Sequence, residues 1–384
     1  MGVALELARK GYDVVVLEAE CVGYGASGRS GGQVASGYSC GMMETADIVG
    51  AADASKLWDF SEAAKEILHS RLTEFNIECD YRDGEFYAAP RRSHLKWLRD
   101  EMSFVEDCYG YEKYRWIDVD EMREVMAGNR YMGALLDTEG GHLNPLNYVV
   151  GMADAATDMT VRIFEGSKVL SYRAGDKVEI LTANGKVTAN SLVLAGNAYL
   201  KNLAAPLERR MIPARSSILA TEPLGKDRAW ELFKSSACVA DTNFDLDYFK
   251  FTPDHRLVYG GQDLSFGRTT RQNNSVRSSM LKTFPMLADA KIDYFWSGEL
   301  SVTRKRLPDL GRLSKNVYYA QGYSGQGVPL SAVVSRILAD AIDGDMARFD
   351  VFARIPHSYI PRNKLLQVPL YYTVLLWNRL KDLL

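Results

Sequence analysis

Apolar residues at the start of the chain follow first the period of a helix and then the pattern of a buried strand. Between Val3 and Ala8 they share one helical face, and Gly11 follows as the expected C-cap. Asp13–Leu17 is a short β-branched run that predicts a buried strand, and Glu18 ends it. This order is that of the second half of a dinucleotide-binding βαβ unit, in which the acid accepts hydrogen bonds from a ribose hydroxyl.

In such a unit a first strand and a G-x-G-x-x-G turn come before the helix. In this sequence they would lie before Met1. We therefore expect the first strand and the G-x-G-x-x-G loop of the fold to be missing.

The middle of the chain alternates helical and strand patterns. Helical periodicity covers 54–75 and 94–105, and Asp118 has the N-cap spacing for a third helix. A further helix begins near Pro145. These helices, and strand candidates around 79–89, 131–137, 161–196, 216–222, 244–261 and 292–296, indicate an α+β domain inserted into a nucleotide-binding α/β domain.

Two glycine-rich segments interrupt these patterns. Residues 23–37 have no apolar periodicity, which predicts an irregular loop, and its place after the expected ribose acid favours ligand contact over a flexible linker. Near the other end, a strand at 317–320, the turn QGYSGQGVPLS and a helix at 332–342 follow one another. The N-terminus of a helix at such a turn suits an anionic ligand atom.

Composition and charge favour small-molecule chemistry. The 384 residues are 47% hydrophobic and carry a net charge of -3, which gives no electrostatic case for nucleic acid. Five scattered cysteines without a C-x-x-C pair indicate neither a disulfide framework nor a zinc site, and a reducing cytoplasm fits them. The histidine spacing predicts no metal site.

The C-terminal stretch 365–384 is too short in its uncharged part to span a membrane. A terminal helix packed on the body is favoured over a helix at a membrane surface.

Several motifs resemble the FAD-dependent amine and amino-acid oxidoreductases of the D-amino-acid oxidase and glycine oxidase superfamily. They are VVVLEAECVGYGASGRSGGQ, NSLVLAGNAY, TRKRLPDLG and GYSGQGVPLSAVVSRILADAI. The resemblance implies FAD as cofactor and a Rossmann-like α/β FAD-binding domain with an inserted α+β substrate domain. The expected FAD-binding segments are 1–45, 142–213 and 301–345, the substrate domain is 46–141 with 214–300, and 346–384 forms a helical tail.

Within the superfamily, the loop GASGR-x-GGQ, the turn GYSG-x-GV and the tail RL-x-DLL are most similar to the γ-glutamylputrescine oxidase group. That similarity implies oxidation of an amine C–N bond to an imine and then an aldehyde, with O2 as acceptor. A sarcosine- or glycine-type amino-acid oxidase is one alternative. Another is a remnant without activity, because the phosphate-binding turn is expected to be missing. The oligomeric state stays open.

Candidate site residues follow from these segments. Arg29 pairs with a pyrophosphate or a carboxylate, unless it is solvated. Arg306 is either a substrate contact or part of a structural ion pair. Alternation places Tyr248 and Lys250 on one strand face. There the lysine would assist the oxygen reaction or repel a cationic substrate, although a solvent-facing strand edge is the favoured interpretation.

Arg306, Tyr248 and Lys250 are the expected catalytic residues. The expected cofactor-binding residues are Glu18, Gly25, Ala26, Ser27, Gly28, Arg29, Gly31, Gly32, Gln33, Val169, Gly196, Gly322, Gly325, Gln326, Gly327 and Val328.

Overall fold

The computed structural model describes the backbone of residues 1–263 and 269–360. The predicted tail contact at 365–384 lies outside the described residues. The helix and strand expected at the start of the chain are confirmed as α1 (Gly2–Arg9) and β1 (Val15–Leu17). β1 is half-buried rather than buried as expected, and it pairs in parallel with β6 (Arg162–Phe164).

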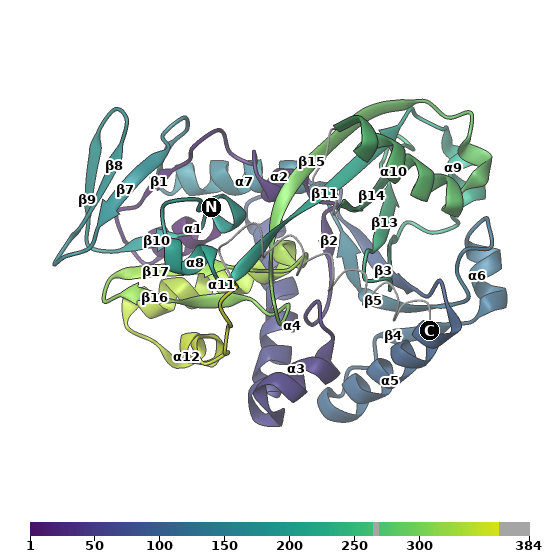
Figure 1. Ribbon diagram of the computed structural model, residues 1–384, viewed down its shortest axis with the longest axis horizontal. Helices are drawn as coiled ribbons and strands as arrows, with labels where there is room; N and C mark the ends of the chain where they lie inside the picture. Colours follow the sequence, from purple (N-terminus) through teal and green to yellow (C-terminus); the bar gives the residue numbers. More distant parts are fainter. Residues whose placement is uncertain (264–268, 361–384) are drawn as a thin grey trace.

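A nine-stranded sheet forms the larger half of the molecule, on the right of Figure 1. Its order is β15-β11-β14-β13-β12-β3-β5-β2, with β4 paired to β5. Every pair is antiparallel except β12 with β3. The strands are β2 (Gln33–Val34), β3 (Arg82–Ala88), β4 (Tyr114–Ile117), β5 (Ala134–His142), β11 (Met211–Thr221), β12 (Cys238–Asp241), β13 (Asp247–Phe251), β14 (Leu257–Asp263) and β15 (Ile292–Thr303).

Smaller sheets make up the other half. One has the order β10 (Leu192–Leu194), β17 (Val317–Gln321) and β16 (Asp309–Ser314), and β10 and β17 are parallel. The second consists of β7 (Val169–Arg173), β8 (Val178–Thr182) and β9 (Lys186–Ala189), and residues 183–185 join its last two strands. Strands β11 and β15 run from the large sheet toward this half (Figure 1).

The helices cover these sheets and fill the space between them. Among the described residues, no helix is long and apolar enough to cross a membrane. The helices are α2 (Ala26–Arg29), α3 (Met42–Val49), α4 (Ala51–Glu74), α5 (Arg92–Tyr109), α6 (Val119–Val125), α7 (Pro145–Asp158), α8 (Ala205–Glu208), α9 (Lys226–Leu232), α10 (Thr269–Thr283), α11 (Gly327–Asp343) and α12 (Ala347–Ala353), with short 3-10 turns η1 (Asn197–Tyr199) and η2 (Pro285–Leu287).

Local capping explains where two predicted helices begin. The Asp118 carboxylate accepts hydrogen bonds from the backbone N–H groups of Asp120 and Glu121 at 3.0 and 2.9 Å, which starts α6. Asn144 caps α7 in the same way, and Pro145 occupies its first turn. Both starts were predicted from the sequence and are confirmed.

Two expectations about the glycine-rich segments are corrected. Residues 23–37 are not wholly irregular, because they contain the short helix α2 and strand β2, which joins the edge of the large sheet beside β5. The last long helix begins at Gly327 rather than near 332. The predicted domain boundaries stay a prediction, and β15 continues through the boundary placed at residue 300.

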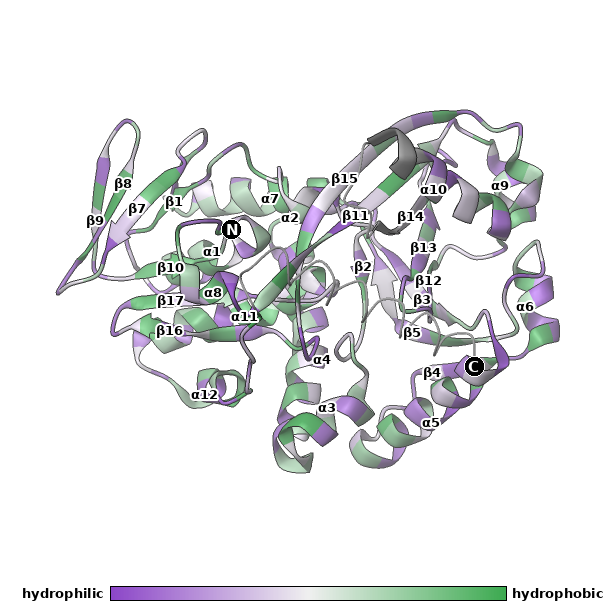
Figure 2. Cartoon of the chain, viewed as in Figure 1, coloured by the Kyte–Doolittle hydropathy of each residue, from purple (hydrophilic) through white to green (hydrophobic). Residues whose placement is uncertain are grey.

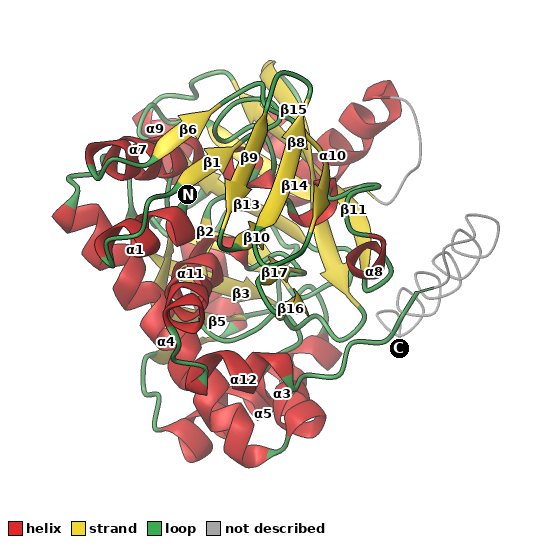
Figure 3. Cartoon of the chain, turned by 90° about the vertical axis from the view of Figure 1, so that its left-hand side faces the viewer, coloured by secondary structure: helices red, strands yellow, loops and turns green. Residues whose placement is uncertain are grey.

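A three-helix contact at the centre of the molecule surrounds a buried ion pair. α11, mostly green in Figure 2, packs against α1 and α4, which Figure 3 shows beside it. At this contact Arg71, only 2% exposed, donates to Glu6 at 2.7 Å and to Ser335 at 2.6 Å. The three side chains come from α4, α1 and α11, so the ion pair joins all three helices.

We expect Glu6→Gln to lower the free energy of unfolding by about 3 kcal/mol, because it leaves the Arg71 guanidinium buried without a charged partner. Urea denaturation measures the change. The matched control is Glu74→Gln, which removes a half-exposed surface partner of Arg9 and should cost less than about 1 kcal/mol. Equal losses in the two variants would contradict a central role for the buried pair.

Candidate active site

Strand β15 holds the first glycine-rich segment in place. The Arg29 guanidinium donates to the backbone oxygen of Ser297 at 3.0 Å, and the Trp296 indole N–H donates to the backbone oxygen of Arg29 at 2.9 Å. Arg29 also lies over the ring of Tyr24. These contacts fix α2 against β15. Arg29 is half-buried, and its contacts with Ser297 and Tyr24 show that it is not simply a solvated side chain.

A second set of hydrogen bonds fixes the other glycine-rich segment to the same strand. The side-chain oxygen of Asn197 accepts from the Ser301 hydroxyl and, at 3.0 Å, from the backbone N–H of Gly322. That N–H also donates to the Ser301 hydroxyl at 2.8 Å. Three chain segments meet here: the end of β10, strand β15 and the turn after β17. We call Asn197, Ser301 and Gly322 the polar junction.

The turn beyond the polar junction leads into a helix N-terminus. Gly322 and Gly325 have positive φ angles of 74° and 108°. α11 then begins at Gly327 with no side-chain cap from Gln326. Its first-turn N–H groups and the positive end of its dipole therefore face this turn, where an anionic ligand atom is stabilised.

The segment Gly31–Gln33 runs between the turn and the large sheet. β2 contacts α11, which brings the two glycine-rich segments together although they are far apart in the sequence. Gly32 has a φ of 81°, and a side chain there would overlap the backbone oxygen of Leu143. The bare backbone at this position is a steric requirement.

Lys250 lies directly beneath this segment. Lys250 is only 7% exposed, and β13 is a central strand between β12 and β14. The favoured interpretation, that Lys250 lies on a solvent-facing strand edge, is therefore wrong. Its ammonium donates to the backbone oxygen of Leu143 at 2.6 Å and lies 3.2 Å from the Cβ position of Gly32. Burial lowers the pKa of Lys250 to about 8.

Tyr248 shares this face of β13, as alternation predicts. Its ring lies between two glycines: a Cβ on Gly260 would overlap the ring, and a Cβ on Gly31 would come within 2.8 Å of it. The Tyr248 hydroxyl is 2.7 Å from that of Ser216 on β11. Burial raises the pKa of Tyr248 to about 12, so the phenol keeps its proton.

The remaining predicted cofactor residues lie on several other elements. Ser167 donates its backbone N–H to the backbone oxygen of Glu18 at 2.7 Å, and Val169 begins β7 two residues later. Gly25 lies against the Tyr199 ring, and Gly196 comes just before the polar junction. Ala26, Ser27 and Gly28 belong to α2, and Val328 belongs to the first turn of α11.

Arg306 stands apart from the other predicted catalytic residues. It has a φ of 56°, its guanidinium lies 4.6 Å from the centre of the Phe244 ring, and its backbone oxygen accepts from Ser39 at 3.4 Å. Phe244 lies just before β13, the strand that carries Tyr248. The structure therefore places Arg306 near the start of this strand.

The site fits a ligand with phosphates and a polar ring system such as FAD. Buried polar atoms normally have hydrogen-bond partners. Among the described residues, Ser30 Oγ, Gln33 Nε2 and Gln326 Oε1 are buried without one, and all three belong to the glycine-rich segments. Arg29, Lys250 and the α11 N-terminus supply positive charge around them. The described residues hold no cluster of metal-ligating side chains and no disulfide.

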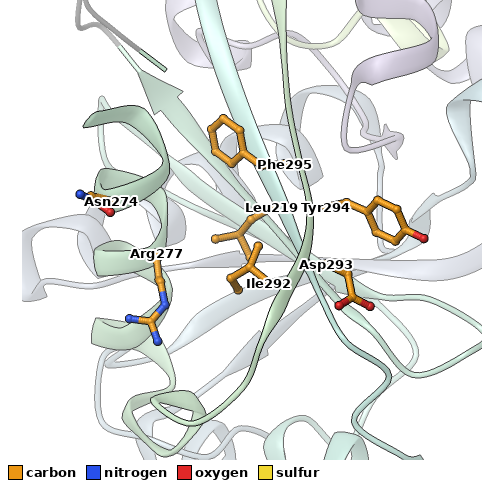
Figure 4. A pocket seen from close by; sticks show the side chains of 7 residues that line it. All are labelled: Leu219, Asn274, Arg277, Ile292, Asp293, Tyr294 and Phe295. Carbon is orange, nitrogen blue, oxygen red and sulfur yellow. The ribbon is translucent and has the colours of Figure 1, made fainter. Parts of the chain in front are cut away.

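Two pockets lie away from these residues. One, shown in Figure 4, has a volume of about 310 Å³ between α10 and the first residues of β15. The other, of about 480 Å³, is lined by residues of α4 and of the segment after α5. Neither contains a residue that the sequence predicted for the site.

Sequence patterns missed three members of the site. Ser301 lies two residues before the motif TRKRLPDLG and is not part of it, and Ser216 is one of several polar residues in β11. Leu143 contributes only its backbone oxygen, and the residue type does not indicate such a contact. Asn197 is the member of the site that the sequence did indicate, because it follows a buried apolar run that ends at Gly196, the kind of strand end where an α/β sheet binds its ligand.

Comparison with known proteins supports one family. The family model described as DAO, FAD dependent oxidoreductase, matches residues 1–341. The chain is 40% identical over 368 residues to the γ-glutamylputrescine oxidoreductase of Escherichia coli (strain K12), covering 95% of this chain and 86% of that protein. It is 36% identical to the probable oxidoreductase OrdL of Haemophilus influenzae, covering 94% and 84%.

Solved structures show the same fold. The glycine oxidase of Geobacillus kaustophilus matches with a TM-score of 0.76 at 18% identity, over 92% of this chain and 96% of that one. The glycine oxidase of Bacillus cereus matches with a TM-score of 0.74 at 18% identity, over 94% and 96%. The predicted α/β fold of the D-amino-acid oxidase type is therefore confirmed. The expected absence of a first strand and phosphate loop stays a prediction.

We expect Gly32→Ala to reduce bound FAD severalfold, because the new methyl group overlaps Leu143 and displaces the segment 31–33. Gly11→Ala is the matched control. Its φ of 82° is nearly the same, but nothing lies within 4 Å of its Cβ position. Both variants should lose about 1 kcal/mol of stability from the left-handed backbone. Flavin absorbance per chain measures the difference, starting from wild type with about one FAD. Equal FAD content in the two variants, or a colourless wild type, would contradict the assignment.

Proposed function

Because the chain belongs to the DAO family of FAD-dependent oxidoreductases, we propose that it oxidises the C–N bond of γ-glutamylputrescine or a similar amine. Its cofactor is FAD. The observation that carries the proposal is the meeting of Tyr248 and Lys250 with the Gly31–Gln33 segment, beside the N-terminus of α11. The resemblance to a γ-glutamylputrescine oxidoreductase over 95% of the chain supports the substrate class.

When bound, the flavin of FAD accepts a hydride equivalent from the carbon that carries the nitrogen and passes the electrons to an acceptor, which we propose is O2. The protein's own residues bind the cofactor and stabilise charge at the site. The first-turn N–H groups of α11 stabilise negative charge at the turn 322–327 without reorganising, since the helix is fixed by its packing. Arg29 and Gly25–Gly28 hold the anionic part of the cofactor.

Lys250 controls charge at the site. In its ammonium form it repels a cationic amine, and in its neutral form it is able to take a proton from one. Its bond to the Leu143 oxygen holds the nitrogen beneath Gly32 in either form. Burial places this change of charge near neutral pH rather than above 10, because the charged form is poorly solvated.

Arg306 supplies a second positive charge near the start of β13. Phe244 stabilises its guanidinium from one side by a cation–π contact. We propose that Arg306 binds the carboxylate of the substrate, because arginine is suited to planar anions.

The substrate is tested by peroxide release. We expect γ-glutamylputrescine to be oxidised with a kcat/KM at least about tenfold above those of sarcosine and glycine, because such a ratio is the usual effect of one lost substrate contact. Aldehyde formed in equal amount to peroxide checks the reaction. Activity on sarcosine or glycine alone would overturn the proposal in favour of an amino-acid oxidase.

We expect the kcat/KM for the amine to rise by about tenfold as the pH passes through about 8, where Lys250 loses its charge. The kcat/KM for O2 should fall over the same range, because the ammonium no longer assists the oxygen reaction. Lys250→Met should remove both changes. Lys291→Met, which alters an exposed lysine, is the control. Unaltered pH profiles in Lys250→Met would contradict the role of Lys250.

A further inference from the structure

The segment Gly31–Gln33, which covers Lys250, leads into a very short strand. β2 has only two residues, which pair with His142 and Gly141 on β5. Strands in globular proteins are usually longer, and so short a pairing supplies few backbone hydrogen bonds. Contacts made by residues next to β2 must therefore help to hold the segment in place.

Ser36, two residues beyond β2, makes such a contact. Its hydroxyl donates to Asp137 Oδ2 on β5 at 2.6 Å and accepts from the Lys65 ammonium on α4 at 2.7 Å. All three residues are at most 5% exposed. One hydroxyl thus connects the segment to a buried anion and a buried cation.

The Tyr111 hydroxyl makes the same two contacts from another part of the chain. It donates to Asp137 Oδ1 at 2.6 Å and accepts from the Lys65 ammonium at 3.2 Å. An ammonium can only donate and a carboxylate can only accept, so the direction of all four hydrogen bonds is fixed. We call Lys65 and Asp137, with the hydroxyls of Ser36 and Tyr111 between them, the bridged ion pair.

The groups around the bridged ion pair preserve its charges. Glu85 on β3 is the register partner of Asp137, and burial together with the Asp137 charge raises the pKa of Glu85 to about 8. Glu85 is therefore mostly neutral at pH 7. Glu62 pairs with Lys65 at 3.0 Å and lines the pocket of about 480 Å³. Loss of Lys65 would leave the Asp137 charge buried without its cation, which is costly.

We propose that the bridged ion pair positions the cofactor segment of the protein, and that Ser36 is the residue through which it acts. From Ser36 the chain leads back through β2 to Gly32, whose backbone oxygen accepts from the Leu143 N–H at 2.9 Å. Ser36, Lys65 and Asp137 are thus positioning residues for FAD. This role concerns the cofactor and holds for any amine that the protein oxidises.

Two matched variants separate positioning from stability. Ser36→Ala and Tyr111→Phe each remove one hydroxyl that bridges the same cation and the same anion, but only Ser36 is joined to the cofactor segment. We expect Ser36→Ala to weaken FAD binding by about tenfold, the usual effect of one lost hydrogen bond to a charged group. Tyr111→Phe should change it by less than about twofold. Flavin fluorescence on dilution of the FAD-loaded protein measures the affinity, and urea denaturation should show similar losses of stability in both variants.

Hydrogen exchange reports on the segment directly, with or without FAD. In Ser36→Ala the backbone amides of residues 31–37 should exchange at least about tenfold faster than in wild type, whereas in Tyr111→Phe their exchange should be unchanged. Ser36→Thr keeps the hydroxyl and should restore both the exchange rate and the FAD affinity.

A double-variant cycle tests the two charges. Lys65→Met and Asp137→Asn should each weaken FAD binding by more than about tenfold, because each leaves one charge buried without its partner. The double variant should bind FAD more tightly than either single variant, since neither charge remains. Lys56→Met, which alters an exposed lysine of the same helix, is the control.

Equal loss of FAD affinity in Ser36→Ala and Tyr111→Phe would overturn the inference, because it indicates a general loss of stability. Unchanged exchange at residues 31–37 in Ser36→Ala would overturn it too, whether FAD is bound or not. Additive losses in the double variant would show that Lys65 and Asp137 do not act as a pair. Failure of the protein to oxidise any amine would contradict the proposed function and leave these measurements unaffected.

Discussion

The polar junction of Asn197, Ser301 and Gly322 is the constraint on which the site depends. It ties a strand end, the long strand β15 and the last glycine turn together through one side-chain oxygen and one hydroxyl. Ser301 is buried, so loss of one partner would leave polar groups without water to replace it. Because Arg29 is held four residues earlier on the same strand, β15 sets the distance between the two glycine-rich segments.

The second constraint is that three positions beside the site carry no side chain. Gly31, Gly32 and Gly260 each face a group that a Cβ would meet or overlap: the Tyr248 ring at two of them and the Leu143 oxygen at the third. Gly31 and Gly32 lie in the loop before β2 and Gly260 lies on β14, and together they allow this loop, two strands and a central lysine to approach closely. The close approach also explains why Lys250 is buried, since Gly32 covers it directly.

Sequence patterns predicted those parts of the molecule that depend on local periodicity. The first helix, the helix capped by Asn144 and the strand before the last glycine turn follow from spacing and caps. The placement of Lys250 was wrong for a physical reason: alternation along β13 shows which residues share a face, but it does not show which element covers that face. The partners of Tyr248 were missed because Ser216 is brought to it only by the pairing of β11, β13 and β14, a contact between distant residues.

β13 couples the site to the core behind it. Tyr248 and Lys250 point toward the Gly31–Gln33 segment, whereas Asp247 and Phe249 point to the opposite face, where Arg130 forms a buried ion pair with Asp247. Arg130 also pairs with Asp241 on the neighbouring strand at 3.1 Å. One arginine thus fixes β12 and β13 relative to each other from behind. The side chains in front then need only short hydrogen bonds, to Ser216 and to the Leu143 oxygen, to be held in place. An ion-pair network on the opposite face of the sheet therefore supports the strand that carries Tyr248 and Lys250.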